Sequence, residues 1–195
     1  MKLVSKLLLI FFMLGLASVC LPQKVLAVSD ERITSFQLYQ PKANQGDADA
    51  QFNLALLYNR GVGTPQDTKQ AVYWYTKAAE QGHANAQYKL GRLYMYGYGE
   101  EVQEGSKWAA YWLTKASEQG LVQAQYNLGH MYEWGDGGPQ DYKLAFFWYT
   151  KAAEQGNFLA KEDRDKMLER MSQSQIEEVQ KLSKELYEKI YNKAK

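Results

Sequence analysis

Ala50-Gln51-Phe52-Asn53-Leu54-Ala55-Leu56-Leu57-Tyr58 is the stretch of this 195-residue chain that decides the fold, because the chain repeats it. The second copy is Ala86-Gln87-Tyr88-Lys89-Leu90-Gly91-Arg92-Leu93-Tyr94, and the third is Ala124-Gln125-Tyr126-Asn127-Leu128-Gly129-His130-Met131-Tyr132. The period is 36 residues from the first copy to the second and 38 from the second to the third. Self-similarity at such a period predicts a protein built from stacked repeat units.

A second block follows each copy, and the first of these blocks is Ala71-Val72-Tyr73-Trp74-Tyr75-Thr76-Lys77-Ala78-Ala79-Glu80-Gln81-Gly82, with counterparts at 109–120 and 145–156. In both kinds of block, recurring residues fall at i, i+3, i+4 and i+7, which predicts a helix. Asp67 and Asp141 precede second blocks as N-caps, and glycines after both kinds of block suit helix ends. Since one helix pair cannot bury its own apolar face, three units are expected to stack into a curved solenoid.

The pattern A-x-A-Q-x-x-L-G-x-x-Y-x-x-G-x-G, then A-x-x-W-Y-x-K-A-A-x-Q-G, resembles the Sel1-like repeat, a relative of the tetratricopeptide repeat. The resemblance covers about residues 46–156, with departures at Ala55, where glycine is usual, and Leu113, where tyrosine is usual. It implies an all-α fold, an α-solenoid of three repeats with N- and C-terminal capping helices. It also implies that the first helix of each unit lines the concave side.

The regions outside the repeats are expected to be a signal peptide and two caps. Residues 28–45 are predicted to be a degenerate N-terminal cap, a decayed second helix broken near Pro41. Residues 157–195 are predicted to be C-terminal capping helices, with a capping box formed by Ser172 and Gln175. The last helix carries a stripe that fits either a cap or a dimerising coiled coil, and we favour the cap. The stripe consists of Ile176, Val179, Leu182, Leu186 and Ile190.

Residues 1–27 are predicted to be a cleavable export signal, which implies a location in the periplasm or outside the cell. A positive start precedes the apolar run 7–21, which is short for a membrane span. Cleavage after Ala27 would leave no stable membrane span. The alternatives are an uncleaved anchor and lipidation at Cys20. With the family resemblance, this signal implies an adaptor of a Gram-negative envelope or a secreted one.

Composition argues against several functions. The first 27 residues contain three lysines and no acid, so the remainder has 20 basic and 22 acidic residues, a net charge of −2. A nucleic-acid partner is not expected, because such binding needs clustered cations. Cys20 is the only cysteine, so a mature chain would lack thiol nucleophiles, disulfides and cysteine-based metal sites.

We predict no catalytic residues, no metal site and no cofactor. The Gly97-Tyr98-Gly99 motif follows a helix, so it is interpreted as a turn and not as a phosphate loop. His130 with Glu133 could be half a metal site or an acid–base pair, but no second histidine joins it. His83 is expected to be exposed beside a turn, and the pair Glu100-Glu101 is interpreted as solvated charges rather than a glycosidase pair.

Positions that vary between units are not needed for the packing that all units share. The most variable positions on the first helices lie on one face. With the concave side that the resemblance implies, they predict a cationic and aromatic groove for a protein or peptide with acidic or carboxylate features. Ordinary variable surface is the alternative. The residues are Asn53, Leu56, Arg60, Lys89, Arg92, Tyr96, Asn127, His130 and Trp134.

We therefore predict a non-catalytic adaptor or scaffold for protein–protein interaction. The rival hypotheses are a β-lactamase-like enzyme and a protein that binds peptidoglycan. The β-lactam-binding Sel1 subfamily staples each helix pair with a disulfide, and this chain would have no mature cysteine to form one.

Overall fold

The computed structural model describes residues 35–97 and 105–191. The predicted signal peptide with Cys20, and the pair Glu100-Glu101, lie outside these residues. Every regular element in the described ranges is a helix. None of these helices combines the length and apolar character needed to cross a membrane.

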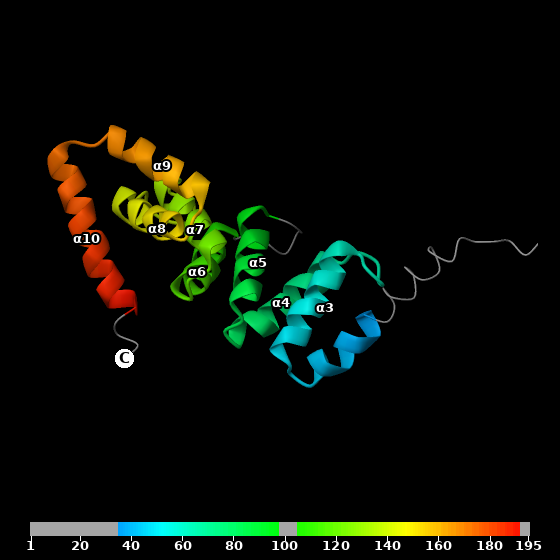
Figure 1. Ribbon diagram of the computed structural model, residues 1–195. Helices are drawn as coiled ribbons and strands as arrows, with labels where there is room; N and C mark the ends of the chain where they lie inside the picture. The colour runs from blue at the N-terminus through cyan, green and yellow to red at the C-terminus, as the bar shows by residue number, and fades with distance from the viewer. Residues whose placement is uncertain (1–34, 98–104, 192–195) are drawn as a thin grey trace, which may run out of the picture.

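The helices follow one another along the molecule from the N-terminal to the C-terminal end (Figure 1). After an unlabelled helix at residues 35–44, they are α3 (Ala48–Arg60), α4 (Thr68–Glu80), α5 (Ala84–Met95), α6 (Gly105–Glu118), α7 (Val122–Trp134), α8 (Tyr142–Glu154), α9 (Phe158–Glu169) and α10 (Gln173–Tyr191).

The helices form stacked pairs. The most extensive contacts join α3 to α4, α5 to α6 and α7 to α8, and smaller contacts join each pair to the next. This arrangement is the α-solenoid that the repeats predicted, with one helix pair for each unit.

Small residues set the spacing within the second and third pairs. A Cβ added at Gly129 in α7 would lie 2.6 Å from a ring carbon of Tyr149 in α8, and one added at Gly91 in α5 would lie 2.9 Å from Leu113 in α6. Glycine at these positions therefore lets a large side chain of the second helix lie against the backbone of the first.

The predicted helix ends are confirmed. The Asp67 carboxylate accepts a hydrogen bond from the Gln70 backbone N–H at 3.0 Å, and Asp141 caps α8 in the same way. Gly61 and Gly135 end α3 and α7 with φ values of +64° and +74°, a conformation that costs other residues more because of their Cβ.

A buried glutamine in the first helix of each unit links neighbouring units. The Gln87 side chain donates to the backbone carbonyl of Ala79 at 3.0 Å and accepts from Gln119 at 2.7 Å. Gln51 makes the same two bonds, to Ala43 and Gln81. We call this set of bonds the glutamine ladder. It satisfies polar groups that are buried between helices, which would otherwise destabilise the fold.

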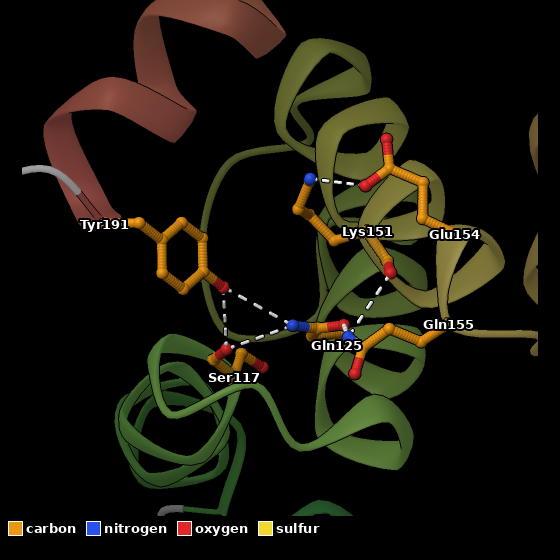
Figure 2. A network of polar contacts seen from close by, with 6 residues as sticks. All are labelled: Ser117, Gln125, Lys151, Glu154, Gln155 and Tyr191. Atoms are coloured by element: carbon orange, nitrogen blue, oxygen red, sulfur yellow. Dashed lines mark hydrogen bonds and ion pairs between the residues drawn. The ribbon is translucent and has the colours of Figure 1, made fainter.

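Figure 2 shows the third step of the ladder. Gln125 donates to the carbonyl of Ser117 at 3.2 Å and accepts from Gln155 at 2.8 Å. The hydroxyl of Tyr191, at the end of α10, also donates to the Ser117 carbonyl at 3.2 Å. The C-terminal helix is thereby tied to the second unit as well as the third.

The described part of the predicted N-terminal cap lacks the predicted break. Residues 35–44 form one continuous helix through Pro41, so the expectation of a break was wrong. Pro41 is exposed, and the helix ends only a few residues beyond it, at Gly46 with φ +96°. The cost of a missing N–H is lower where the helix is open to water.

The C-terminal helices close the other end. α9 lies next to α8, but α10 folds back and packs on α8. Leu186 and Ile190 contact the cluster that contains Phe147, and Val179 is buried. The apolar stripe is thus used within the chain, as expected for a cap. The predicted capping box forms, with reciprocal bonds between Ser172 and Gln175.

Candidate functional site

The surface of α3, α5 and α7, here called the first-helix face, carries the predicted site residues. In the second unit, Lys89 and Arg92 of α5 and its C-cap residue Tyr96 line a single cavity of about 310 Å³. These positions are three and four residues apart, so one helix presents all of them on one side. The sequence prediction for this unit therefore identified residues that share a cavity.

The cavity lies between the first and second units and has a mixed polar and apolar lining. α3 and the loop after it contribute Asn59 and Gln66, and α4 contributes Thr68 and Tyr75. Leu93 of α5 is also part of the lining. The sequence prediction named none of these five residues, because they belong to other columns of the first helices, to the loop or to the second helix.

Positive charge gathers at this cavity. Burial, and then the guanidinium groups of Arg92 and Arg60, hold the pKa of Lys89 below its usual value. Arg92 also lies over the rings of Tyr88 and Tyr96, with its guanidinium carbon 5.8 and 5.4 Å from the ring centroids. Cation–π contact of this kind holds a guanidinium in place while leaving its N–H groups available.

The other predicted residues are divided between structural and exposed positions. Asn53 donates to the Asp49 carbonyl of its own helix at 2.8 Å, and Leu56 packs against the core of the first two units. Asn127 is half-buried. These three residues are therefore weaker candidates for contact with a partner.

The third unit offers an aromatic patch without the cations. The rings of His130 and Trp134 lie 6.0 Å apart, and Trp134 is 65% exposed. The Glu133 carboxylate, considered above as a partner of His130, instead accepts a hydrogen bond from the Tyr149 hydroxyl at 2.7 Å. The His130–Glu133 acid–base interpretation loses its support, because this carboxylate is already engaged.

His83 was wrongly predicted to be exposed. Its side chain is only 15% exposed and lies 3.2 Å from the Asp49 carboxylate. Its Nδ1 accepts a hydrogen bond from the Ala86 backbone N–H, which makes His83 the N-cap of α5. The imidazole stacks on Phe52, so this histidine joins the first unit to the second.

A larger cavity, of about 580 Å³, lies between α8 and the C-terminal helices. Its apolar wall includes Met167, Met171 and Val179, and an ion pair joins Lys143 to Glu178 beside it. Among the described residues, no group of three or more histidine, cysteine or acidic side chains is placed to hold a metal ion.

The stacked helix pairs define an α-solenoid of the tetratricopeptide-like class. The chain belongs to the Sel1 repeat family, whose model matches residues 48–83, 84–121 and 122–157. Repeats of this family generally mediate protein–protein interaction, and the repeat is typically a non-catalytic scaffold.

Three solved structures are similar to this chain. A Sel1 repeat protein from Oxalobacter formigenes is 38% identical, with a TM-score of 0.61 over 67% of this chain and 96% of that one. Cysteine-rich protein B of Helicobacter pylori is 21% identical, with a TM-score of 0.53 over 68% and 94%. The protective antigen c5321 of uropathogenic Escherichia coli is 31% identical, with a TM-score of 0.48 over 82% and 42%. No curated protein matches.

Proposed function

We propose that this protein is a non-catalytic adaptor that binds a protein partner on the first-helix face, in the bacterial envelope or outside the cell. The observation that carries the proposal is the convergence of Lys89, Arg92 and Tyr96 on one cavity, with Arg60 close enough to lower the pKa of Lys89. Arginine and aromatic side chains are enriched among residues that dominate binding energy at interfaces.

The chemistry of this face favours a partner segment that carries negative charge. Arg92 is held by two tyrosine rings, so little side-chain freedom is lost when it binds a carboxylate. A protein segment lying along α5 would also contact Tyr96, which is 53% exposed. The export part of the proposal rests on the sequence of residues 1–27.

The test is a pull-down from envelope extract with two variant baits beside the native protein. One bait carries Lys89→Ala, Arg92→Ala and Tyr96→Ala. The matched control carries Lys77→Ala, Lys115→Ala and Tyr111→Ala, which removes two cations and one exposed tyrosine from the second helices. Circular dichroism first establishes that both variants keep the native helix content.

We expect a partner that the native and control baits retain and the α5 variant loses. Equal retention by all three baits would move the binding surface away from the first-helix face. Turnover of a chromogenic β-lactam by the purified protein, above that of a heat-denatured sample, would contradict the non-catalytic assignment.

A further inference from the structure

Two positions, compared across the three repeat units, reveal an incomplete site in the first unit. In the third unit, Tyr149 of α8 donates to the carboxylate of Glu133 in α7. In the second unit the same two positions hold Leu113 and Met95, an apolar pair that requires no hydrogen bond. At these two positions, therefore, neither the second nor the third unit has a side chain that needs a further hydrogen-bond partner.

The first unit has the tyrosine but not the carboxylate. Tyr75 is fully buried, and its hydroxyl has no hydrogen-bond partner among the described residues. Asn59 stands where the third unit has Glu133. Buried polar groups are normally hydrogen-bonded, so this hydroxyl is available to donate to a ligand.

The surroundings of Tyr75 differ in charge from those of Tyr149. Tyr75 and Asn59 line the same cavity as Lys89 and Arg92. At the position that corresponds to Lys89, the helix next to the third unit has Asp163, which adds to the acidic surroundings of Tyr149. The first unit therefore combines an unused hydroxyl donor with neighbouring cations, a combination suited to an anion.

We infer that the cavity between α3, α4 and α5 is a binding site for a single carboxylate group. The ligand carboxylate takes the place that Glu133 has in the third unit: it accepts a hydrogen bond from Tyr75, and Lys89 and Arg92 supply the opposite charge. A volume of about 310 Å³ suits one acidic side chain or a chain terminus. The inference rests on the proposed adaptor function for its natural source, an acidic residue of the partner.

The direct test compares N-acetyl-glutamate with N-acetyl-glutamine, which has nearly the same shape but no charge. Binding to the full chain is followed by chemical-shift changes in NMR spectra. We expect the glutamate compound to bind in the millimolar range and the glutamine compound not to bind. Equal binding of both compounds, or no binding of either at concentrations well above the millimolar range, would overturn the site.

Two variants test whether the Tyr75 hydroxyl contributes to ligand binding independently of any effect on the fold. Tyr75→Phe removes one oxygen atom, and we expect about a tenfold loss of affinity for N-acetyl-glutamate, as for a hydrogen bond to a charged group. Tyr149→Phe is the matched control, because its hydroxyl already bonds Glu133, and its affinity should match that of the native chain. Unchanged affinity in Tyr75→Phe would refute the role of Tyr75.

A third variant supplies the missing carboxylate from within the chain. Asn59→Glu should reproduce the Glu133–Tyr149 pair, raise the melting temperature and abolish binding of N-acetyl-glutamate. Asn59→Gln, which matches Asn59→Glu in size but is neutral, should not raise the melting temperature and should weaken binding of N-acetyl-glutamate less than Asn59→Glu does. A lower melting temperature for Asn59→Glu, together with unchanged ligand binding, would contradict the inference.

The outcomes distinguish this site from the adaptor role. If the α5 variant loses a protein partner but the native chain does not prefer N-acetyl-glutamate, the adaptor stands and the carboxylate site fails. If N-acetyl-glutamate binds as expected but no partner depends on the α5 residues, the carboxylate site stands and the proposed adaptor function fails.

Discussion

Gln87 contacts two other helices at once, since its amide donates to α4 and accepts from the end of α6. Replacing Gln87 with alanine removes both bonds and leaves space inside the stack. We expect Gln87→Ala to lower the free energy of unfolding by about 2–4 kcal/mol, measured by urea denaturation. Gln123→Ala, at an exposed position of α7, is the control. Equal urea midpoints for the two variants would show that the ladder does not stabilise the fold.

Gly129 tests the close approach of α7 and α8. A methyl group there would meet the ring of Tyr149, whose hydroxyl is held by Glu133. We expect Gly129→Ala to reduce stability by about 1–3 kcal/mol through overpacking, despite the better helix propensity of alanine. Gly138→Ala, where an added Cβ meets nothing within 4 Å, should melt like the native protein. A native melting temperature for Gly129→Ala would contradict this account.

Tyr149 should also make stability depend on alkaline pH. Burial, followed by its hydrogen bond to Glu133, raises the pKa of Tyr149 far above the ordinary value of 10.0. The unfolded chain loses this proton near pH 10 while the folded chain keeps it, so stability is unaffected below pH 10 and falls above it.

The corresponding variant is Tyr149→Phe. Between pH 10 and 11.5 we expect its free energy of unfolding to fall less steeply than that of the native protein, by up to about 1.4 kcal/mol per pH unit. At pH 7 the variant should be less stable because it lacks the hydrogen bond. Urea denaturation at a series of pH values measures both effects, and parallel pH profiles would exclude Tyr149 as the titrating group.

The candidate site could be predicted only in part at the residue scale. Lys89, Arg92 and Tyr96 were accessible because they vary between units and share one helix face. Tyr75 could not be predicted, since the equivalent residue of the third unit, Tyr149, is also a tyrosine and the pattern indicates a purely structural residue. The two tyrosines differ in their hydrogen-bond partners, because Asn59 of α3 stands at the position that Glu133 has in α7.

At the scale of helices, α10 has the clearest consequence for stability. Tyr73 and Tyr111 are 51% and 47% exposed, whereas Phe147, at the equivalent position of α8, is fully buried. The difference arises because α10 covers this face of the third unit. A side chain of this size contributes about 1.5–3 kcal/mol when fully buried.

Removal of residues 173–195 should therefore expose Phe147 and its neighbours. We expect a loss of at least about 3 kcal/mol and increased binding of a hydrophobic dye. Leu186→Ala and Ile190→Ala together, in the full chain, are milder changes that should act in the same direction. Native stability in the truncated chain would mean that α10 is not needed to seal the third unit.

The helices themselves could be predicted from the repeat pattern, because spacing and end signals depend on local sequence. Two features required the three-dimensional structure. The helix at 35–44 tolerates Pro41 because that turn is exposed. α10 carries a stripe that fits either a cap or a coiled coil, and only its packing on α8 distinguishes the two.

At the scale of the whole molecule, the most extensive contacts between units of the described residues join neighbours in the chain, so stability should be graded along the stack. Hydrogen exchange is expected to be slowest in α5–α7, which have neighbours on both sides, and fastest in the helix at 35–44, which has one. Mass spectrometry of peptides along the chain measures this gradient. Uniform protection would indicate that the described units open as one cooperative block.

The glutamine ladder has a consequence for how such a protein changes over generations. Each step uses the same donor and acceptor, so a 36-residue duplication inserted after Gly120 would find its bonding partners already in place. The column ends at α9, where Lys161 stands in the glutamine position and pairs with Asp165. Duplication of a unit can thus lengthen the stack, and the lysine at position 161 ends the column of glutamines.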